Sequence, residues 1–161
     1  MKVEQMMNRA VMACHPGDSL ERAAQLMWDN ACGGLVVTDN HSRPVGFLTD
    51  RDICMATYTR GQLLRELTVK GAMASRIVCC GVDDDLDDAM RQMREKHLRR
   101  LPVVTRDGTL IGLLSLDDIG YEAGRPLRGG SNHQLREQVA DVFIGICHGR
   151  VAARAPHAKG S

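Results

Sequence analysis

The stretch "GFLTDRD" (residues 46–52) ends an apolar run with a hydroxyl residue, and a carboxylate follows that hydroxyl three positions later. At an offset of 66 residues, "GLLSLDD" (residues 112–118) repeats the arrangement with Ser in place of Thr. In both copies the residues that follow can form a helix, so the hydroxyl would stand at its start. A motif that occurs twice in this way predicts an internal duplication.

The duplication extends beyond the motif. Residues 7–53 align with 73–119 at the constant offset of 66 without a gap. Identical pairs include Met7/Met73, Asp18/Asp84, Leu20/Leu86, Ala23/Ala89, Met27/Met93, Leu35/Leu101, Val37/Val103, Gly46/Gly112, Leu48/Leu114, Asp52/Asp118 and Ile53/Ile119. We therefore expect two copies of one supersecondary unit, joined by the segment "TRGQLLRELTVKGA".

Each copy has the pattern of a strand, a helix, two strands and a second helix. In the first copy "AVMAC" is expected to be a short strand, and Asp18 is expected to cap the next helix in a capping box with Glu21. The expected buried face of that helix has apolar residues at spacings of three and four: Leu20, Ala23, Ala24, Met27 and Ala31. "LVVT" and "VGFL" are then expected to be short strands on either side of the polar turn "DNHSRP".

The second copy repeats this pattern. "RIVCC" is expected to be a strand, residues 84–96 a helix, and "LPVVT" and "LIGLL" two strands around the turn "RDG". The expected buried face of the helix consists of Leu86, Ala89, Met90 and Met93. The predicted fold class is α+β, with two tandem βαββα repeats and a C-terminal helical extension. The expected domain boundaries are 1–60 for the first repeat, 61–124 for the second and 125–161 for the extension.

The extension lies outside the duplicated frame. "GRPLRGGSNHQ" has the composition of a turn and linker, and "RVAARAPHAKGS" that of a mobile tail. Between them, apolar residues recur at helical spacing and predict an extra helix: Leu135, Val139, Val142, Phe143 and Ile146. The sequence leaves open whether this helix covers the repeats or contacts a partner.

Composition excludes several classes of protein. Of the 161 residues 43% are hydrophobic and 25% charged, which is typical of a globular protein with a substantial core. The formal net charge of +1 and the aromatic content of 3% argue against nucleic acid as a partner. No apolar run has the length of a signal peptide or a membrane span, so we expect a cytoplasmic protein that does not bind membranes.

The six cysteines form no C-x-x-C pair, and we expect most of them to be reduced, buried thiols. A metal or redox role stays open as an alternative because His15 follows Cys14 and His148 follows Cys147.

The duplicated hydroxyl and carboxylate allow two interpretations. Thr49 with Asp52, and Ser115 with Asp118, have the spacing of a capping box, which satisfies backbone amides in the first turn of a helix. A helix start with a free hydroxyl can also bind an anion, and a carboxylate there can accept both vicinal hydroxyls of a ribose. The second interpretation favours a nucleotide over a bare anion.

Several segments together carry a family resemblance: "SLERAAQLM", "LVVT" and "PVGFLTDRDI" in the first copy, and "DLDDAMRQM" and "RRLPVVTRDGTLIGLLSLDDI" in the second. From about residue 5 to residue 123 the chain resembles a tandem pair of CBS domains, the Bateman module. In size it is similar to small stand-alone bacterial proteins that consist of little else, including the hypoxic-response kind.

The resemblance implies two repeats packed sheet to sheet about a pseudo-twofold axis, with two clefts between them. In many members such clefts bind AMP, ADP, ATP, NAD or S-adenosylmethionine. The resemblance implies that Asp52 and Asp118 hold ribose, and that Thr49 and Ser115 hold ribose or phosphate. It also implies that adenine is flanked by edge strands around four residues: Cys14, His15, Val78 and Cys79.

The arginines distinguish the two copies. Arg99 and Arg100 are placed to bind phosphate, with solvated surface arginines as the alternative. The first copy has Gly33 and Gly34 in their place, and it carries Arg51 where the second copy has Asp117. We therefore expect two sites that are not equivalent, with Arg51 a candidate ligand contact in the first.

No catalytic triad, Walker loop or metal-ligand cluster occurs, so the chain is expected not to be an enzyme. The leading hypothesis is a regulatory protein that binds an adenosyl ligand and acts on an unidentified partner. A ligand-free interaction protein and a thiol or zinc sensor are the alternatives. Exposed apolar positions in "DICMATY" and "DIGYEA" further predict a homodimer.

Overall fold

The computed structural model of the protein describes residues 1–125 and 133–152, with side chains as far as Gly149. The chain forms two compact units. One consists of Met1–Met7, Val82–Leu101 and the described part of Leu114–Ser161, and the other of Asn8–Gly81 with Pro102–Leu113. Most of the expected linker and most of the expected tail lie outside the described residues.

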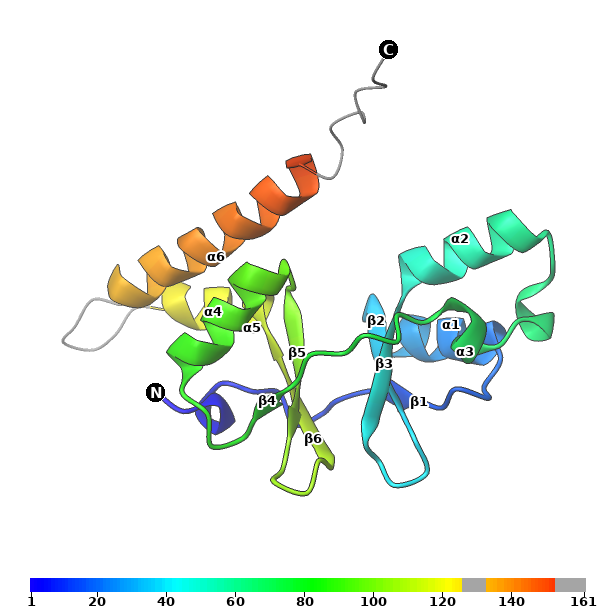
Figure 1. Ribbon diagram of the computed structural model, residues 1–161, viewed down its shortest axis with the longest axis horizontal. Coiled ribbons are helices and arrows are strands. Elements are labelled where there is room, and N and C mark those ends of the chain that lie inside the picture. Colours follow the sequence, from blue (N-terminus) through cyan, green and yellow to red (C-terminus); the bar gives the residue numbers. More distant parts are fainter. Residues whose placement is uncertain (126–132, 153–161) are drawn as a thin grey trace, which may run out of the picture. The chain divides into compact units, whose positions relative to one another are not determined.

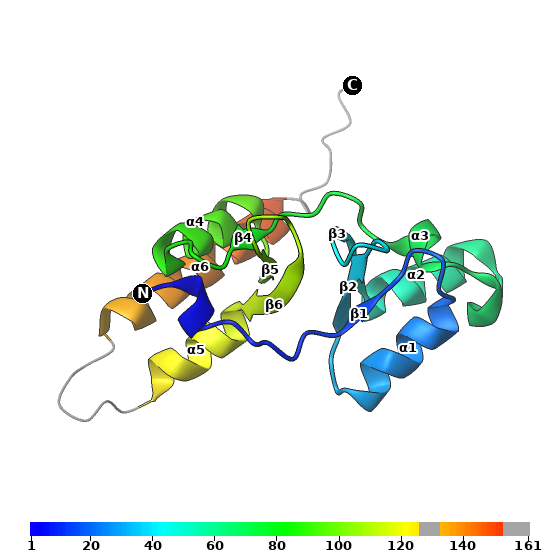
Figure 2. The same cartoon turned by 90° about the horizontal axis from the view of Figure 1, so that it is seen from below.

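The first repeat has the predicted order of elements. Its elements are β1 (Ala13–Cys14), α1 (Leu20–Asp29), β2 (Gly34–Thr38), β3 (Pro44–Thr49) and α2 (Asp50–Arg60). The sheet has the order β1-β2-β3, with β1 parallel and β3 antiparallel to β2. In both views α1 and α2 lie on the same side of this sheet (Figures 1 and 2). A buried face on each helix explains this placement, because the apolar side chains must be removed from water.

The second repeat has the same order. Its elements are β4 (Cys80–Gly81), α4 (Leu86–Lys96), β5 (Arg100–Val104), β6 (Leu110–Ser115) and α5 (Leu116–Gly124). The sheet order is β4-β5-β6, and the register of β4 on β5, Cys80 opposite Val103, matches that of Cys14 opposite Val37 in the first repeat. Gly108, with φ of 87°, makes the turn between β5 and β6 as the "RDG" segment predicts.

The cores of the two repeats use equivalent leucines. Three pairs at the offset of 66 are all at most 1% exposed: Leu20/Leu86, Leu35/Leu101 and Leu48/Leu114. Burying each such side chain contributes about 1.5–3 kcal/mol. The two expected helix faces are confirmed at the buried residues of α1 and α4: Leu20, Ala23 and Met27, and Leu86, Ala89, Met90 and Met93.

Each repeat is completed by a segment that precedes the other copy's strands. A 3-10 turn, Val3–Gln5, lies beside the start of α4, where Val3 N donates to Asp84 O at 3.0 Å. The equivalent segment, which contains η2 (Leu64–Glu66) and α3 (Val69–Ala72), lies beside the start of α1, where Val69 N donates to Asp18 O at 2.9 Å. Further backbone hydrogen bonds also occur in equivalent pairs, with residue numbers that differ by 66. The bond from Glu4 to Val82 corresponds to that from Lys70 to Pro16, and the bond from Leu86 to Met1 to that from Leu20 to Leu67. The bonds between Asn8 and Leu113 correspond to those between Ala74 and Phe47.

The predicted extra helix is present as α6 (His133–Ala152), which packs against α4 and α5 (Figures 1 and 2). Val142 and Ile146 are buried in this contact, whereas Phe143 is 54% exposed and does not belong to the buried face. Gly145 lies so close to α4 that a Cβ on it would be 2.6 Å from Cγ of Arg94. The helix therefore covers the second repeat, which answers the question that the sequence leaves open.

Four local predictions are wrong. The cap of α1 is Ser19 and not Asp18, because the Asp18 carboxylate accepts a hydrogen bond from His15 N at 2.8 Å in the preceding turn. Ala31 is exposed, because α1 ends at Asp29. The helix expected from residue 84 begins at Leu86. The first strand of each repeat has only two residues, because it pairs with its neighbour at only two positions.

Candidate functional site

The first duplicated motif forms a complete capping box at the start of α2. Thr49 has an extended backbone, and its Oγ1 accepts a hydrogen bond from Asp52 N at 3.2 Å. In return, Asp52 Oδ2 accepts from Thr49 N at 2.9 Å and from Thr49 Oγ1 at 2.6 Å. These bonds satisfy amides that the first helical turn leaves without an intrahelical partner. The capping interpretation is confirmed for this copy.

The second motif caps α5 in a similar way. Ser115 Oγ accepts from Asp118 N at 3.0 Å and donates to Asp118 Oδ2 at 2.6 Å. Ser115 is buried, with 6% of its surface exposed, whereas Asp118 is exposed. In both motifs Oδ2 of the aspartate accepts from the hydroxyl, and in the first motif it also accepts from the Thr49 amide. Among the described residues, Oδ1 of Asp52 and of Asp118 receives no hydrogen bond, so each carboxylate keeps one oxygen that can accept from a ligand.

The two arginines that were expected to bind phosphate contact Asp117 in the first turn of α5. Arg99 Nη2 lies 2.8 Å from Asp117 Oδ1, and Arg100 Nη2 lies 3.7 Å from Asp117 Oδ2. Leu116 N donates to Arg99 O at 2.9 Å, and this bond fixes the start of β5 against the start of α5. The second repeat thus pairs both arginines with Asp117, a carboxylate that lies between Ser115 and Asp118 in the chain.

Arg51, the counterpart of Asp117 in the first repeat, is exposed in the first turn of α2. The positions equivalent to the arginine pair are occupied by Gly33, which lies just before β2, and Gly34, the first residue of β2. A Cβ on Gly34 would lie 2.7 Å from the ring of Phe47, so the aromatic side chain leaves no room for a larger residue there. The two motifs therefore differ in charge and in shape, as the sequence predicts.

Cys14 and His15 lie at the end of β1. Cys14 is buried, and burial, together with the charge of Asp18, raises the pKa of its thiol to about 12. His15 is exposed, and its Nδ1 lies 3.1 Å from Thr38 O. Cys14 pairs with Val37 whereas Thr49 pairs with Gly34, three positions away along β2. That separation is roughly 10 Å, so Cys14 and Thr49 of this repeat do not form one local cluster.

Val78 and Cys79 were expected on an edge strand, and this expectation is wrong. The strand β4 contains only Cys80 and Gly81, so both residues precede it. They are half-buried, and burial raises the pKa of the Cys79 thiol. A neutral thiol is a poor metal ligand and a poor nucleophile. Among the described residues no three His, Cys, Asp or Glu side chains are grouped so that they could hold a metal ion.

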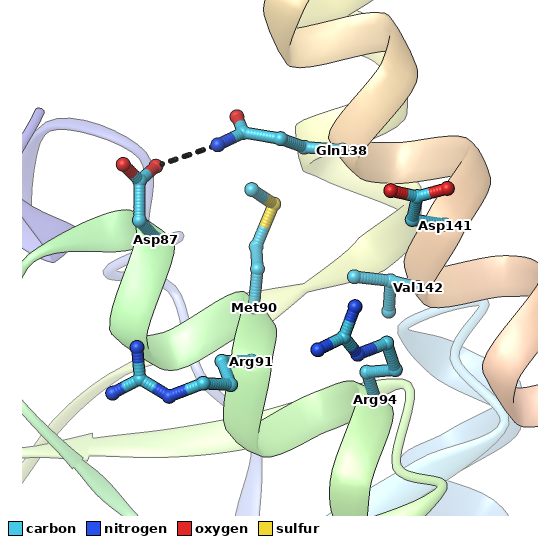
Figure 3. Close-up of a pocket in the computed structure, with 7 residues that line it drawn as sticks. All are labelled: Asp87, Met90, Arg91, Arg94, Gln138, Asp141 and Val142. Carbon is cyan, nitrogen blue, oxygen red and sulfur yellow. Dashed lines mark hydrogen bonds between the residues drawn. The ribbon is translucent and has the colours of Figure 1, made fainter.

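Three hollows in the described part of the chain lie on helical faces, and one of them, of about 200 Å³ between α2 and α3, includes Asp52 in its lining. One of about 570 Å³ lies between α1 and α2, and the exposed Trp28 at its rim was not singled out from the sequence. Its lining consists of Ala24, Met27, Trp28, Ala31, Cys32, Gly33, Asp50 and Ile53. A smaller one of about 170 Å³ lies between α4 and α6, where Gln138 Nε2 donates to Asp87 Oδ1 at 3.1 Å (Figure 3). Trp28 breaks the helical spacing of buried residues in α1, which is the signal that marks it as a surface feature.

Comparison with known proteins identifies the family. The model of the CBS domain matches residues 3–58 and again residues 65–120. A CBS domain-containing protein of Bacillus subtilis is 30% identical over 146 residues, which cover 91% of this chain and 95% of the relative. The chain belongs to the CBS-domain family.

Other CBS relatives are longer than this chain. An uncharacterized protein of Methanopyrus kandleri is 26% identical over 119 residues, 74% of this chain and 61% of the relative. The inosine-5'-monophosphate dehydrogenase of Methanocaldococcus jannaschii is 29% identical over 120 residues, 73% of this chain and 23% of the enzyme. The similarity to the dehydrogenase thus spans less than a quarter of that enzyme.

Solved CBS structures share the fold. A conserved CBS domain protein of Thermoplasma acidophilum gives a TM-score of 0.71 at 26% identity, over 90% of this chain and 75% of that one. Hypoxic Response Protein I, solved with two coordinated zinc ions, gives a TM-score of 0.69 at 25% identity, over 78% of this chain and 100% of that one.

Two more distant structures contain adenosyl ligands. A CBS domain pair solved with 5'-methylthioadenosine and S-adenosylmethionine gives a TM-score of 0.68 at 20% identity, over 77% of this chain and 96% of that one. The cytosolic domain of the Mg²⁺ channel MgtE, solved with ATP, gives a TM-score of 0.64 at 24% identity, over 73% of this chain and 47% of that one. In the described part of this chain no helix is both long and apolar enough to cross a membrane.

Proposed function

We propose that this CBS pair is a regulatory protein that binds an adenosyl ligand, one of AMP, ADP, ATP, NAD or S-adenosylmethionine, and does not catalyse a reaction. One observation carries the proposal. Asp52 and Asp118 each use one carboxylate oxygen to bind the residue that caps the helix and keep the other available, at the start of a helix whose dipole also favours an anion. A ribose donates two vicinal hydroxyls, and such a carboxylate is a suitable acceptor for them.

Two structures of the same fold support the class of ligand. One contains 5'-methylthioadenosine and S-adenosylmethionine, and the other contains ATP. An adenosyl group is common to all three molecules, whereas their 5' substituents differ. The proposal for this chain therefore assigns adenosyl recognition to the duplicated motif and leaves the 5' substituent to the residues that differ between the two copies.

We further propose that the protein acts as a homodimer that pairs through the α1 and α2 faces. On the second repeat, α6 covers the equivalent helices α4 and α5. On the first repeat, the same face is an open hollow of about 570 Å³, with Trp28 83% exposed. Met55 and Tyr58 on α2 are also exposed, at 45% and 81%. A second copy of the chain would remove these side chains from water on both protomers at once.

A ligand-free interaction protein is the second candidate. It is favoured by the fact that both hydroxyls already cap their helices and bind their aspartates without a ligand. Under this reading, the open face around Trp28 would be the functional surface.

Mass spectrometry of protein purified without dialysis separates the candidates. The proposal predicts an adenosyl compound that is released on denaturation in an amount comparable with the protein. Bare protein that also binds none of the five compounds on addition would reject the proposal and favour the interaction protein. About one zinc ion per chain would instead favour a metal sensor.

A further inference from the structure

The second repeat carries a pair of arginines that is joined to a carboxylate of the same chain. Asp117 contacts Arg99 at 2.8 Å and Arg100 at 3.7 Å, one arginine on each of its oxygens. All three side chains are partly open to solvent, with 40%, 34% and 56% of Arg99, Arg100 and Asp117 exposed. The cluster is therefore reachable by a ligand that binds at Ser115 and Asp118, the neighbours of Asp117 in the chain.

The arginine pair is not fully satisfied by this contact. Nε of Arg99 is buried and has no hydrogen-bond partner among the described residues. A guanidinium group can donate five hydrogen bonds, and the contacts with Asp117 use only part of that capacity. Phosphate and carboxylate bind guanidinium with the same planar, charge-assisted geometry, so either of them can occupy Arg99 and Arg100.

The first repeat lacks this cluster. Glycines replace both arginines, and Arg51 replaces Asp117, so a cation stands where the second repeat has an anion. A ligand phosphate next to the first motif would meet Arg51 between the carboxylates of Asp50 and Asp52, without a competing arginine pair. A phosphate next to the second motif would meet Asp117, and it would have to displace this carboxylate to reach the arginines.

We infer that Asp117 is a specificity residue of the second motif, because its carboxylate competes with ligand phosphate for Arg99 and Arg100. This inference rests on the proposed adenosyl site and adds the class of ligand to it. The second motif selects adenosyl compounds without a phosphate chain, such as a nucleoside or a thioether or sulfonium derivative of one. The first motif lacks this competition, because glycines stand in place of the two arginines and Arg51 in place of Asp117.

Exposed ion pairs of this kind are weak, so the competition is adjustable and not absolute. Each exposed pair changes an equilibrium by a factor of up to about five, and two pairs together predict roughly a three- to tenfold effect. Removing the negative charge of Asp117 also removes its repulsion of a phosphate, which acts in the same direction.

The test compares the wild-type protein with Asp117→Asn by calorimetric titration with adenosine, ATP and tripolyphosphate at one fixed ionic strength. The variant should bind ATP and tripolyphosphate roughly three to ten times more tightly, and its affinity for adenosine should change less than twofold. Asp88→Asn is the matched control, because Asp88 also pairs with an arginine, Arg91 at 2.6 Å on α4, but is not near the motif in the chain. This control should alter none of the three affinities.

The outcomes distinguish the inference from the proposed function. Adenosine binding together with unchanged affinities for ATP and tripolyphosphate in Asp117→Asn would overturn the inference and leave the adenosyl site standing. Tripolyphosphate contains no nucleoside, so it reports on Arg99 and Arg100 even if adenosine does not bind. Unchanged tripolyphosphate affinity in the variant therefore overturns the inference in every case, and absence of adenosine and ATP binding separately rejects the proposed function.

Discussion

Asp52→Asn separates the two roles of the duplicated motif, because the substitution keeps most of the cap but changes the available oxygen. In the structure, Oδ2 of Asp52 accepts from Thr49 N and from Thr49 Oγ1. The amide oxygen of asparagine can take over both bonds. What is lost is the negative charge at the start of α2, which contributes about 0.3–1 kcal/mol to the stability of a helix. For a chain of this size, about 1 kcal/mol corresponds to a melting temperature lower by about 2–4 °C.

The same substitution is more harmful to ligand binding. The amide nitrogen takes the place of Oδ1, so a donor faces the ribose hydroxyl in place of an acceptor. Losing a hydrogen bond to a charged group costs about 1.5–3 kcal/mol, which raises the dissociation constant by roughly ten- to a hundredfold. The binding loss should therefore exceed the stability loss.

The assay combines thermal unfolding with calorimetric titration of AMP, ATP, NAD and S-adenosylmethionine. Asp50→Asn is the control, since it removes the same charge from the same first turn but from a residue that takes no part in the hydrogen bonds between Thr49 and Asp52. Asp52→Ala should lower stability further than Asp52→Asn, because it removes both bonds to Thr49. Adenosyl binding that is equally strong in the wild-type protein, in Asp52→Asn and in Asp118→Asn would refute the reasoning and leave both motifs as helix caps only.

Three further predictions concern stability and assembly. Sedimentation of the wild-type protein should give twice the 17.7 kDa mass of one chain, whereas Trp28→Arg should sediment as a monomer. The control Phe143→Arg, on the exposed side of α6, should still form a dimer, and a dimer that persists in Trp28→Arg would contradict the proposed interface. Gly149→Val should lower the free energy of unfolding by about 1–3 kcal/mol, because a Cβ at this position would lie 2.5 Å from His97 Nδ1 and weaken the packing of α6. Gly124→Ala should have little effect, because a Cβ there meets no atom within 4 Å, and equal unfolding curves for the two variants would argue against the close packing at Gly149. Burial raises the pKa of Cys14 from about 9 to about 12, so between these pH values the folded state keeps a proton that the unfolded state loses, and the free energy of unfolding should fall as the pH rises. Cys14→Ala should make the free energy of unfolding less dependent on pH between 9 and 12, and an unchanged slope would exclude this thiol as the cause.

Features that depend on local spacing could be predicted from the sequence. The caps at Thr49 and Ser115 and the leucine faces of α1 and α4 all involve residues within a few positions of each other. Such patterns follow directly from helix geometry, and each of them occurs in both copies at the offset of 66. The family resemblance rests on the same residues.

Features that depend on distant segments could not be predicted. Ser19 and not Asp18 caps α1 because the Asp18 carboxylate accepts from His15 N, and the Asp18 carbonyl also binds the distant Val69 amide. No local pattern indicates that residues 1–7 complete the second repeat, because the interaction is made by backbone hydrogen bonds to residues about 80 positions away. The sequence named the arginine pair as a phosphate site, but its contact with Asp117 depends on how β5 meets α5.

A crystal structure of the protein with a bound adenosyl ligand is the most direct test of the central claim. We expect the ribose hydroxyls to lie within hydrogen-bond distance, about 2.6–3.2 Å, of the carboxylate of Asp52 or Asp118, while Oδ2 of that residue still accepts from Thr49 or Ser115. A ligand bound elsewhere, with both aspartates making only their cap hydrogen bonds, would contradict it.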